Sequence, residues 1–113
     1  MEARIVLVLC TVPDLACAER IARVLVEARL AACVNIVPGM RSVYRWQGAV
    51  ESANELQLVI KTVAERTRTV EETLRVHHPY ELPEIIVVPV VDGSPAYLRW
   101  VAEESRGQDT LYV

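Results

Sequence analysis

Phenylalanine is absent from this 113-residue chain, and aromatic residues together make up only 5% of it. Hydrophobic residues as a whole nevertheless reach 52%, while charged residues stay at 24%. The composition therefore excludes an intrinsically disordered chain, and valine, leucine, isoleucine and alanine must build the core. The length fits one domain, so we expect residues 1–113 to form a single folded unit.

The chain also lacks an excess of positive charge, a long apolar run and a regular cysteine pattern. Its formal net charge is -3, which gives no attraction to nucleic acids or anionic membranes. No segment contains the roughly 20 consecutive apolar residues of a membrane-spanning helix. Cys10, Cys17 and Cys33 include no CxxC pair. Their odd number favours reduced thiols in a cytoplasmic protein over a disulfide framework.

Motifs of several common protein classes are missing as well. The sequence contains no GxGxxG fingerprint, no P-loop and no MxCxxC metal-carrying loop. No serine has an evident histidine partner for nucleophilic catalysis, so no enzymatic activity is predicted. The acidic chain also lacks the strand aromatics of RNA-recognition domains.

Hydrophobic periodicity predicts secondary structure in the order β-α-β-β-α-β-α. Strands are predicted over residues 4–11, 32–44, 52–62 and 85–91. Asp14 is placed to cap the first helix, and Ser94-Pro95 opens the third. Thr62-Val63-Ala64-Glu65 matches a capping box for the second helix, which must stop before Pro79. Residues 110–113 are expected to add a short edge strand.

The element order predicts an α+β fold. Right-handed crossovers turn βαββαβ into a ferredoxin-like sandwich, to which the last helix is added. Pro38-Gly39 predicts a bulge in the second strand, and Trp46-Gln47-Gly48 predicts the turn of a hairpin. The first and fourth strands are apolar on both faces, although only one face has two helices to cover it. We therefore expect other subunits to cover the open face.

Both histidines of the chain lie in one corner, His77-His78-Pro79-Tyr80-Glu81. Imidazole groups combined with the thiolate of Cys10 suit copper or zinc, so Cys10, His77 and His78 are candidate metal ligands. The alternative interpretation is structural. In it the histidines stabilise the last carbonyls of the second helix, and Cys10 is a small core residue.

A second set of candidates surrounds the predicted hairpin. Glu55 and Lys61 share the polar face of one strand, and Glu51, Glu81 and Glu84 add further carboxylates. On an open surface such charges form a solvated ion pair of little energetic weight. Cover from another subunit would desolvate them and make a ligand site. Trp46, at the hairpin tip, could anchor an interface or line a pocket.

Several blocks of residues resemble one known family, the CutA divalent-cation tolerance proteins. The blocks occur in the family's order and cover essentially the whole chain. They are Leu30-Ala31-Ala32-Cys33-Val34-Asn35-Ile36, Tyr44-Arg45-Trp46-Gln47-Gly48 with Glu51 and Glu55, Ile60-Lys61-Thr62, His78-Pro79-Tyr80-Glu81-Leu82-Pro83-Glu84-Ile85 and Tyr97-Leu98-Arg99-Trp100.

This resemblance implies a homotrimer of ferredoxin-like subunits, similar in architecture to the PII signal-transduction proteins. It implies tolerance to copper or another divalent cation, no catalytic reaction and no organic cofactor. Cys10 and His78 match positions associated with metal binding in the family, whereas His77 is an additional histidine that only some members carry. The alternative is a PII-like small-ligand sensor or interaction module. Its intersubunit cleft would be lined by Trp46, Glu55, Lys61, Tyr80 and Glu81.

Overall fold

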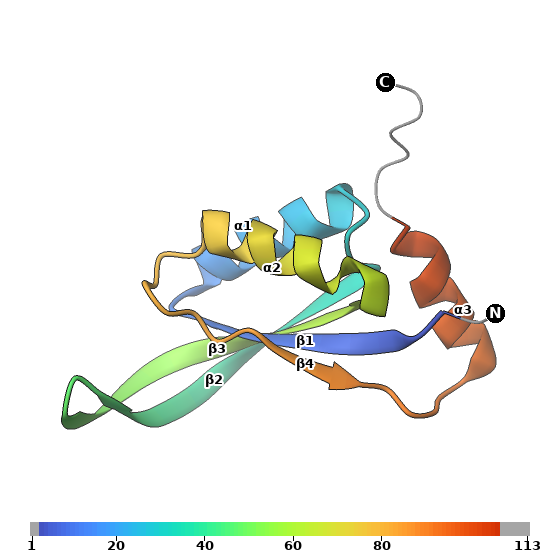
Figure 1. Cartoon of the computed structure of the whole chain (residues 1–113). Coiled ribbons are helices and arrows are strands. Elements are labelled where there is room, and N and C mark those ends of the chain that lie inside the picture. The colour runs from blue at the N-terminus through green and yellow to red at the C-terminus, as the bar shows by residue number, and fades with distance from the viewer. Residues whose placement is uncertain (1–2, 107–113) are drawn as a thin grey trace.

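The computed structural model describes residues 3–106 and contains the predicted succession of strands and helices (Figure 1). The predicted edge strand at 110–113 lies outside the described residues. The elements are β1 (Ile5–Val12), α1 (Leu15–Glu27), β2 (Cys33–Trp46), β3 (Ala49–Val63), the short 3-10 helix η1 (Ala64–Arg66), α2 (Thr67–His77), β4 (Ile86–Pro89) and α3 (Pro95–Glu104).

The strands form one four-stranded sheet in the order β2-β3-β1-β4, and β1 pairs antiparallel with both of its neighbours. Helices α1 and α2 lie over one face of this sheet, while α3 lies beyond its end (Figure 1). This arrangement confirms the predicted ferredoxin-like α+β fold. None of the helices in the described part of the chain is long and apolar enough to cross a membrane.

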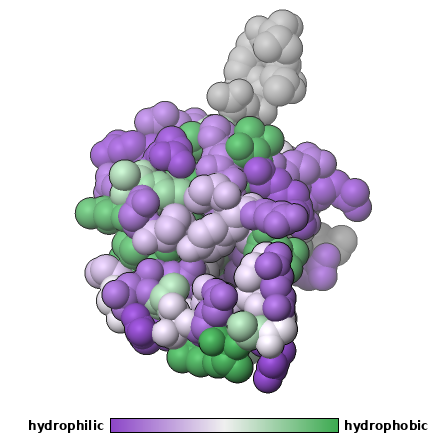
Figure 2. Space-filling view, turned by 90° about the vertical axis from the view of Figure 1, so that its left-hand side faces the viewer, coloured by the Kyte–Doolittle hydropathy of each residue, from purple (hydrophilic) through white to green (hydrophobic). Residues whose placement is uncertain are grey.

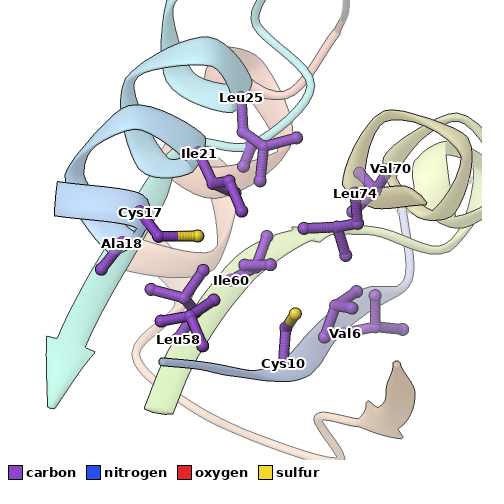
Figure 3. Packing of buried hydrophobic residues seen from close by; sticks show 13 residues of the cluster. Val6, Cys10, Cys17, Ala18, Ile21, Leu25, Leu58, Ile60, Val70 and Leu74 are labelled. Carbon is purple, nitrogen blue, oxygen red and sulfur yellow. The ribbon is translucent and has the colours of Figure 1, made fainter. Parts of the chain in front are cut away.

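The main core lies between the sheet and the two covering helices (Figure 3). Alternate residues of β1 contribute to it because successive side chains of a strand point to opposite faces. Ile21 and Leu25 of α1 and Leu74 of α2 close the core from above. Its residues are aliphatic side chains and two cysteines, as the lack of phenylalanine predicted. Asp14 caps α1 by accepting a hydrogen bond from the Cys17 backbone N–H at 2.8 Å.

The β2–β3 hairpin extends well beyond the rest of the sheet (Figure 1). β1 ends at Val12, opposite Leu56, so the hairpin residues beyond that pair have no third strand beside them. Gln47 and Gly48 both have positive φ and form a two-residue turn of the kind that suits strand twist. The pairing shifts between Val37 and Met40, which confirms the bulge predicted at Pro38-Gly39.

The predicted capping box at Thr62 is wrong. Thr62 lies in β3, fully buried, and pairs with Val6 of β1. Its hydroxyl donates to the carbonyl of Leu30 at 2.7 Å, so it serves the sheet rather than a helix start. The second helix begins only after η1, at Thr67. Pairing with β1 overrides the local capping pattern because it also buries the neighbouring apolar residues.

The fourth strand is shorter and more exposed than predicted. It covers only Ile86–Pro89 and lies at the sheet edge, where a proline is tolerated. Ile86 and Val87 are half exposed, and Val91, predicted to be buried, is 94% exposed. Further apolar side chains, including Val43 and Val50, project from the hairpin. Figure 2, which views the molecule from the hairpin end, shows green apolar groups along the lower edge among purple polar ones. Cover by other subunits remains a prediction for these groups.

Candidate functional site

A cavity of about 640 Å³ lies between the projecting hairpin and the loop that connects α2 to β4. It forms here because β1 ends at Val12, and the loop after α2 crosses that end to reach the sheet edge. Strands β2 and β3 supply one wall and the loop supplies the other. The cavity is lined by Thr11, Ser42, Tyr44, Trp46, Glu55, Pro79, Tyr80, Glu81, Leu82, Pro83 and Glu84.

Glu55 and Tyr80 join the two walls of the cavity. The Tyr80 hydroxyl donates to Glu55 Oε2 at 2.5 Å. Burial and the hydrogen bond to the Glu55 carboxylate both raise the pKa of the Tyr80 phenol, so the phenol stays protonated and remains the donor. Glu55 is only 8% exposed, an unusual degree of burial for a carboxylate on a strand that projects from the sheet.

Glu84 is held by two polar side chains from the sheet. The Thr11 hydroxyl donates to Glu84 Oε1 at 2.6 Å, and the Gln57 side-chain amide donates to Oε2 at 3.3 Å. The same amide of Gln57 donates to the Cys10 carbonyl at 3.2 Å. Each carboxylate oxygen has two lone pairs, so Glu84 keeps acceptor capacity for a ligand.

His78 fastens the loop to the end of β1. The Tyr80 backbone N–H donates to His78 Nδ1 at 3.1 Å, so Nε2 carries the proton and donates to the Thr11 carbonyl at 2.8 Å. The imidazole also packs against the Tyr80 ring with centroids 4.8 Å apart. His78 is therefore a structural clamp that orients Tyr80 toward Glu55. Nε2 carries the proton and the lone pair of Nδ1 accepts the Tyr80 N–H, so this arrangement leaves no ring lone pair open to a metal.

The electrostatic character of the cavity is acidic. Glu55, Glu81 and Glu84 line it, and among residues 3–106 no lysine or arginine does so. The salt bridges found in the described part of the chain all lie elsewhere. Positively charged ligands are thus favoured at this site over anions.

The other predicted metal ligands do not gather around His78. Cys10 is fully buried in the core between the sheet and α1 (Figure 3). Burial, with a smaller contribution from the Glu84 charge, raises the pKa of its thiol to about 12, which opposes the thiolate that a metal requires. His77 is half-buried at the last turn of α2. Within residues 3–106, no three histidine, cysteine, aspartate or glutamate side chains come together as a metal-binding group.

Four of the five predicted cleft residues do line the cavity, namely Trp46, Glu55, Tyr80 and Glu81. Lys61 does not, because six residues of extended strand place it about 20 Å from Glu55 along β3. Its ammonium instead donates to the Tyr97 hydroxyl of α3 at 3.2 Å. In one chain Lys61 and Glu55 therefore belong to different sites, and a shared site between subunits remains a prediction.

Sequence reasoning missed Thr11 and Gln57 as site residues. Both follow from the strand register, because Thr11 is the direct partner of Gln57 across β1 and β3. Alternation along β3 puts Gln57 on the same face as Glu55, and this signal was present in the sequence. Glu84 was among the predicted carboxylates, but its hydrogen bonds with Thr11 and Gln57 depend on the path of the loop, which no local pattern specifies.

Comparison with known proteins places these features in a family context. The family model described as CutA1 divalent ion tolerance protein matches residues 6–104. The divalent-cation tolerance protein CutA of Thermus thermophilus is 48% identical over 98 residues, which cover 87% of this chain and 95% of that protein. The crystal structure of CutA1 from Oryza sativa has a TM-score of 0.90 at 37% identity and covers 94% of this chain and 97% of its own. A structure from Archaeoglobus fulgidus, described as a periplasmic divalent cation tolerance protein, has a TM-score of 0.87 at 37% identity, with 89% and 98% covered.

Proposed function

Because this chain belongs to the CutA1 family of divalent ion tolerance proteins, we propose that it acts in divalent-cation tolerance by binding a cation in the acidic cavity between the hairpin and the loop. The observation that carries the proposal is the cavity's set of carboxylates, which no basic side chain of the described residues neutralises there. Glu55 and Glu84 are the proposed anchors, because the hydrogen bonds of Tyr80 and Thr11 fix their orientation in advance.

The proposed ion is a divalent cation, and the carboxylates of the cavity favour a hard ion over copper. Carboxylate oxygens favour harder ions, whereas copper and zinc prefer imidazole and thiolate ligands. Two anchored carboxylates would bind a cation that keeps part of its hydration shell, in the manner typical of Mg²⁺. Copper binding through Cys10, His77 and His78 remains the competing assignment. It would require the loop clamp at His78 to open and the buried Cys10 thiol to ionise.

Calorimetric titration of the reduced, metal-free protein with copper, nickel, zinc and magnesium salts tests this proposal. We expect saturable binding that weakens at least tenfold in Glu55→Gln and Glu84→Gln, each of which removes one charge and keeps the side-chain shape. Glu51→Gln is the matched control, because Glu51 lies exposed on the same strand and outside the cavity. Full-affinity binding by both cavity variants, combined with loss in His77→Ala, would move the site to the histidine corner. If none of the four metals binds, the proposal is overturned.

We further propose that the protein works as a homotrimer in the cytoplasm and catalyses no reaction. Support for the trimer comes from the half-exposed apolar residues of β4 and the exposed valines of the hairpin, which a second and third chain would cover. Support for the cytoplasm comes from three cysteines that are all free, two of them buried. The related Archaeoglobus protein carries a different description, periplasmic, so cell fractionation is the direct test of compartment.

A second candidate function is that of a PII-like small-ligand sensor or interaction module. The size of the cavity favours it, because about 640 Å³ lies within the range typical of small-molecule sites and exceeds what one metal ion fills. A ligand that binds only the folded state would raise the thermal stability of the protein by linkage.

A further inference from the structure

We propose that the cavity recognises a small organic cation, an alkylammonium group whose charge meets Glu55 and whose carbon chain lies against the aromatic side chains. The inference deepens the proposed cation-binding function and rests on it. A metal ion held by Glu55 and Glu84 gives no role to the aromatic and apolar side chains that make up most of the remaining lining. A ligand that carries both a positive charge and a hydrocarbon part would use the whole cavity.

The charged end of the cavity is organised around one oxygen of Glu55. Oε2 accepts the hydrogen bond from the Tyr80 hydroxyl, while Oε1 accepts none from the described residues and is accessible rather than buried. The Glu55 residue is more than nine-tenths buried, and no salt bridge of the described residues compensates its charge. The Tyr80 hydroxyl supplies a donor to this carboxylate but no positive charge, whereas an ammonium group at Oε1 would supply both the charge and up to three N–H donors.

The aromatic part of the cavity comes from both of its walls. Tyr44 and Trp46 are two residues apart on β2, so their side chains project from the same face of the strand. Tyr80 approaches from the loop and is fixed by its bond to Glu55. These three rings are partly exposed, and each lines the cavity. Aromatic faces attract organic cations through the ring quadrupole, and tryptophan does so most strongly.

The remaining lining excludes other classes of ligand. Pro79, Leu82 and Pro83 add apolar surface from the loop, which suits a hydrocarbon chain better than a hydrated ion. An anion would meet three glutamates with no lysine or arginine of the described residues beside them. A neutral ligand would leave the charge of Glu55 uncompensated. The chemistry of the lining therefore selects for positive charge on an apolar body.

Three probes of equal length separate these classes, namely n-butylammonium, 1-butanol and butyrate. Each is titrated into the full chain by calorimetry at constant ionic strength, and thermal unfolding is recorded in parallel at constant protein concentration. We expect saturable binding and a rise in Tm for n-butylammonium alone. Metal and n-butylammonium should compete, because both use Glu55.

Variants divide the contributions to binding. Glu55→Gln should weaken both n-butylammonium and metal at least tenfold. Trp46→Leu and Tyr44→Leu should each weaken n-butylammonium by about three- to thirtyfold and leave metal affinity unchanged. Retained metal binding shows that these two variants are folded. Glu51→Gln should change neither ligand.

Each outcome has one meaning. Metal binding without n-butylammonium binding overturns this inference and preserves the proposed function. Tighter binding of 1-butanol or butyrate than of n-butylammonium shows that the cavity takes a ligand of another class. Absence of both metal and n-butylammonium binding overturns the inference and the proposed function together. Equal n-butylammonium affinity in the wild type, Trp46→Leu and Tyr44→Leu would show that these aromatic side chains do not contribute to binding.

Discussion

Replacement of His78 by alanine should destabilise the protein strongly, whereas replacement of its neighbour His77 should not. His78 is 8% exposed, and its ring makes one hydrogen bond to the Thr11 carbonyl and another with the Tyr80 backbone N–H. The His77 side chain is half-buried. The hydrogen bond between His77 and Arg20 uses the backbone carbonyl of His77, which accepts from the Arg20 guanidinium at 3.5 Å, and not the imidazole. The two adjacent imidazoles thus differ sharply in structural role.

The magnitude follows from the two hydrogen bonds. Each contributes about 1 kcal/mol net, and a buried backbone group left without a partner costs about 1–3 kcal/mol. His78→Ala should therefore lower the free energy of unfolding by about 2–4 kcal/mol. His77→Ala should change it by no more than about 0.5 kcal/mol. Asparagine at position 78 reproduces the acceptor toward Tyr80 but cannot reach Thr11, so His78→Asn should lose about half as much as alanine.

Guanidinium chloride unfolding of the four proteins, followed by circular dichroism, measures these differences. Protein concentration must be constant, because the stability of an oligomer depends on it. Equal stability of His77→Ala and His78→Ala would refute the assignment of His78 as the loop clamp. The result also bears on metal titrations, since loss of metal binding in a variant lacking His78 reports on the folded loop as well as on ligation. His77→Ala alone is the cleaner test of a histidine ligand.

Two other perturbations test the core. Burial raises the pKa of the Cys10 thiol from 9.0 to about 12, so above pH 9 the unfolded chain loses a proton that the folded protein keeps. Below pH 9 the Cys10 thiol should cause no pH dependence of the free energy of unfolding. Between pH 9 and 12 the thiol should lower that free energy by up to about 1.4 kcal/mol per pH unit. Cys10→Ala should make this slope shallower, and an identical slope in the variant would contradict a raised pKa of the thiol in the folded protein. Leu74→Ala should cost about 2–5 kcal/mol in urea unfolding, because Leu74 is 0% exposed in the core. Val76→Ala, on the same helix but at a residue 79% exposed, should cost no more than about 0.5 kcal/mol, and similar losses in the two variants would show that α2 packs through a different face.

The element order and the fold class could be predicted because they depend on local patterns. The Asp14 cap, the Gln47-Gly48 turn and the bulge near Pro38 all act within a few residues and all occur as predicted. The capping box at Thr62 failed for the opposite reason. A residue with a good local helix signal was drawn into the sheet by pairing with Val6, a contact between distant parts of the chain.

The candidate site shows the same division. The family resemblance predicted an intersubunit cleft lined by Trp46, Glu55, Lys61, Tyr80 and Glu81, and all of these except Lys61 line the cavity within one chain. Residue types, however, do not reveal which partner each group has. His78 was a candidate metal ligand by chemistry, yet its two ring nitrogens are engaged by backbone groups from β1 and from its own loop.

The sequence by itself determined the succession of strands and helices, the aliphatic core and the concentration of imidazole, phenol and carboxylate groups after α2. The tertiary structure alone decided that β1 ends before the hairpin does and that the loop after α2 closes the resulting space. It also decided that Lys61 lies far from that space in one chain. Periodicity and capping are encoded by neighbouring residues, whereas a cavity is formed by elements far apart in sequence. Only the packing of those elements fixes which side chains face one another.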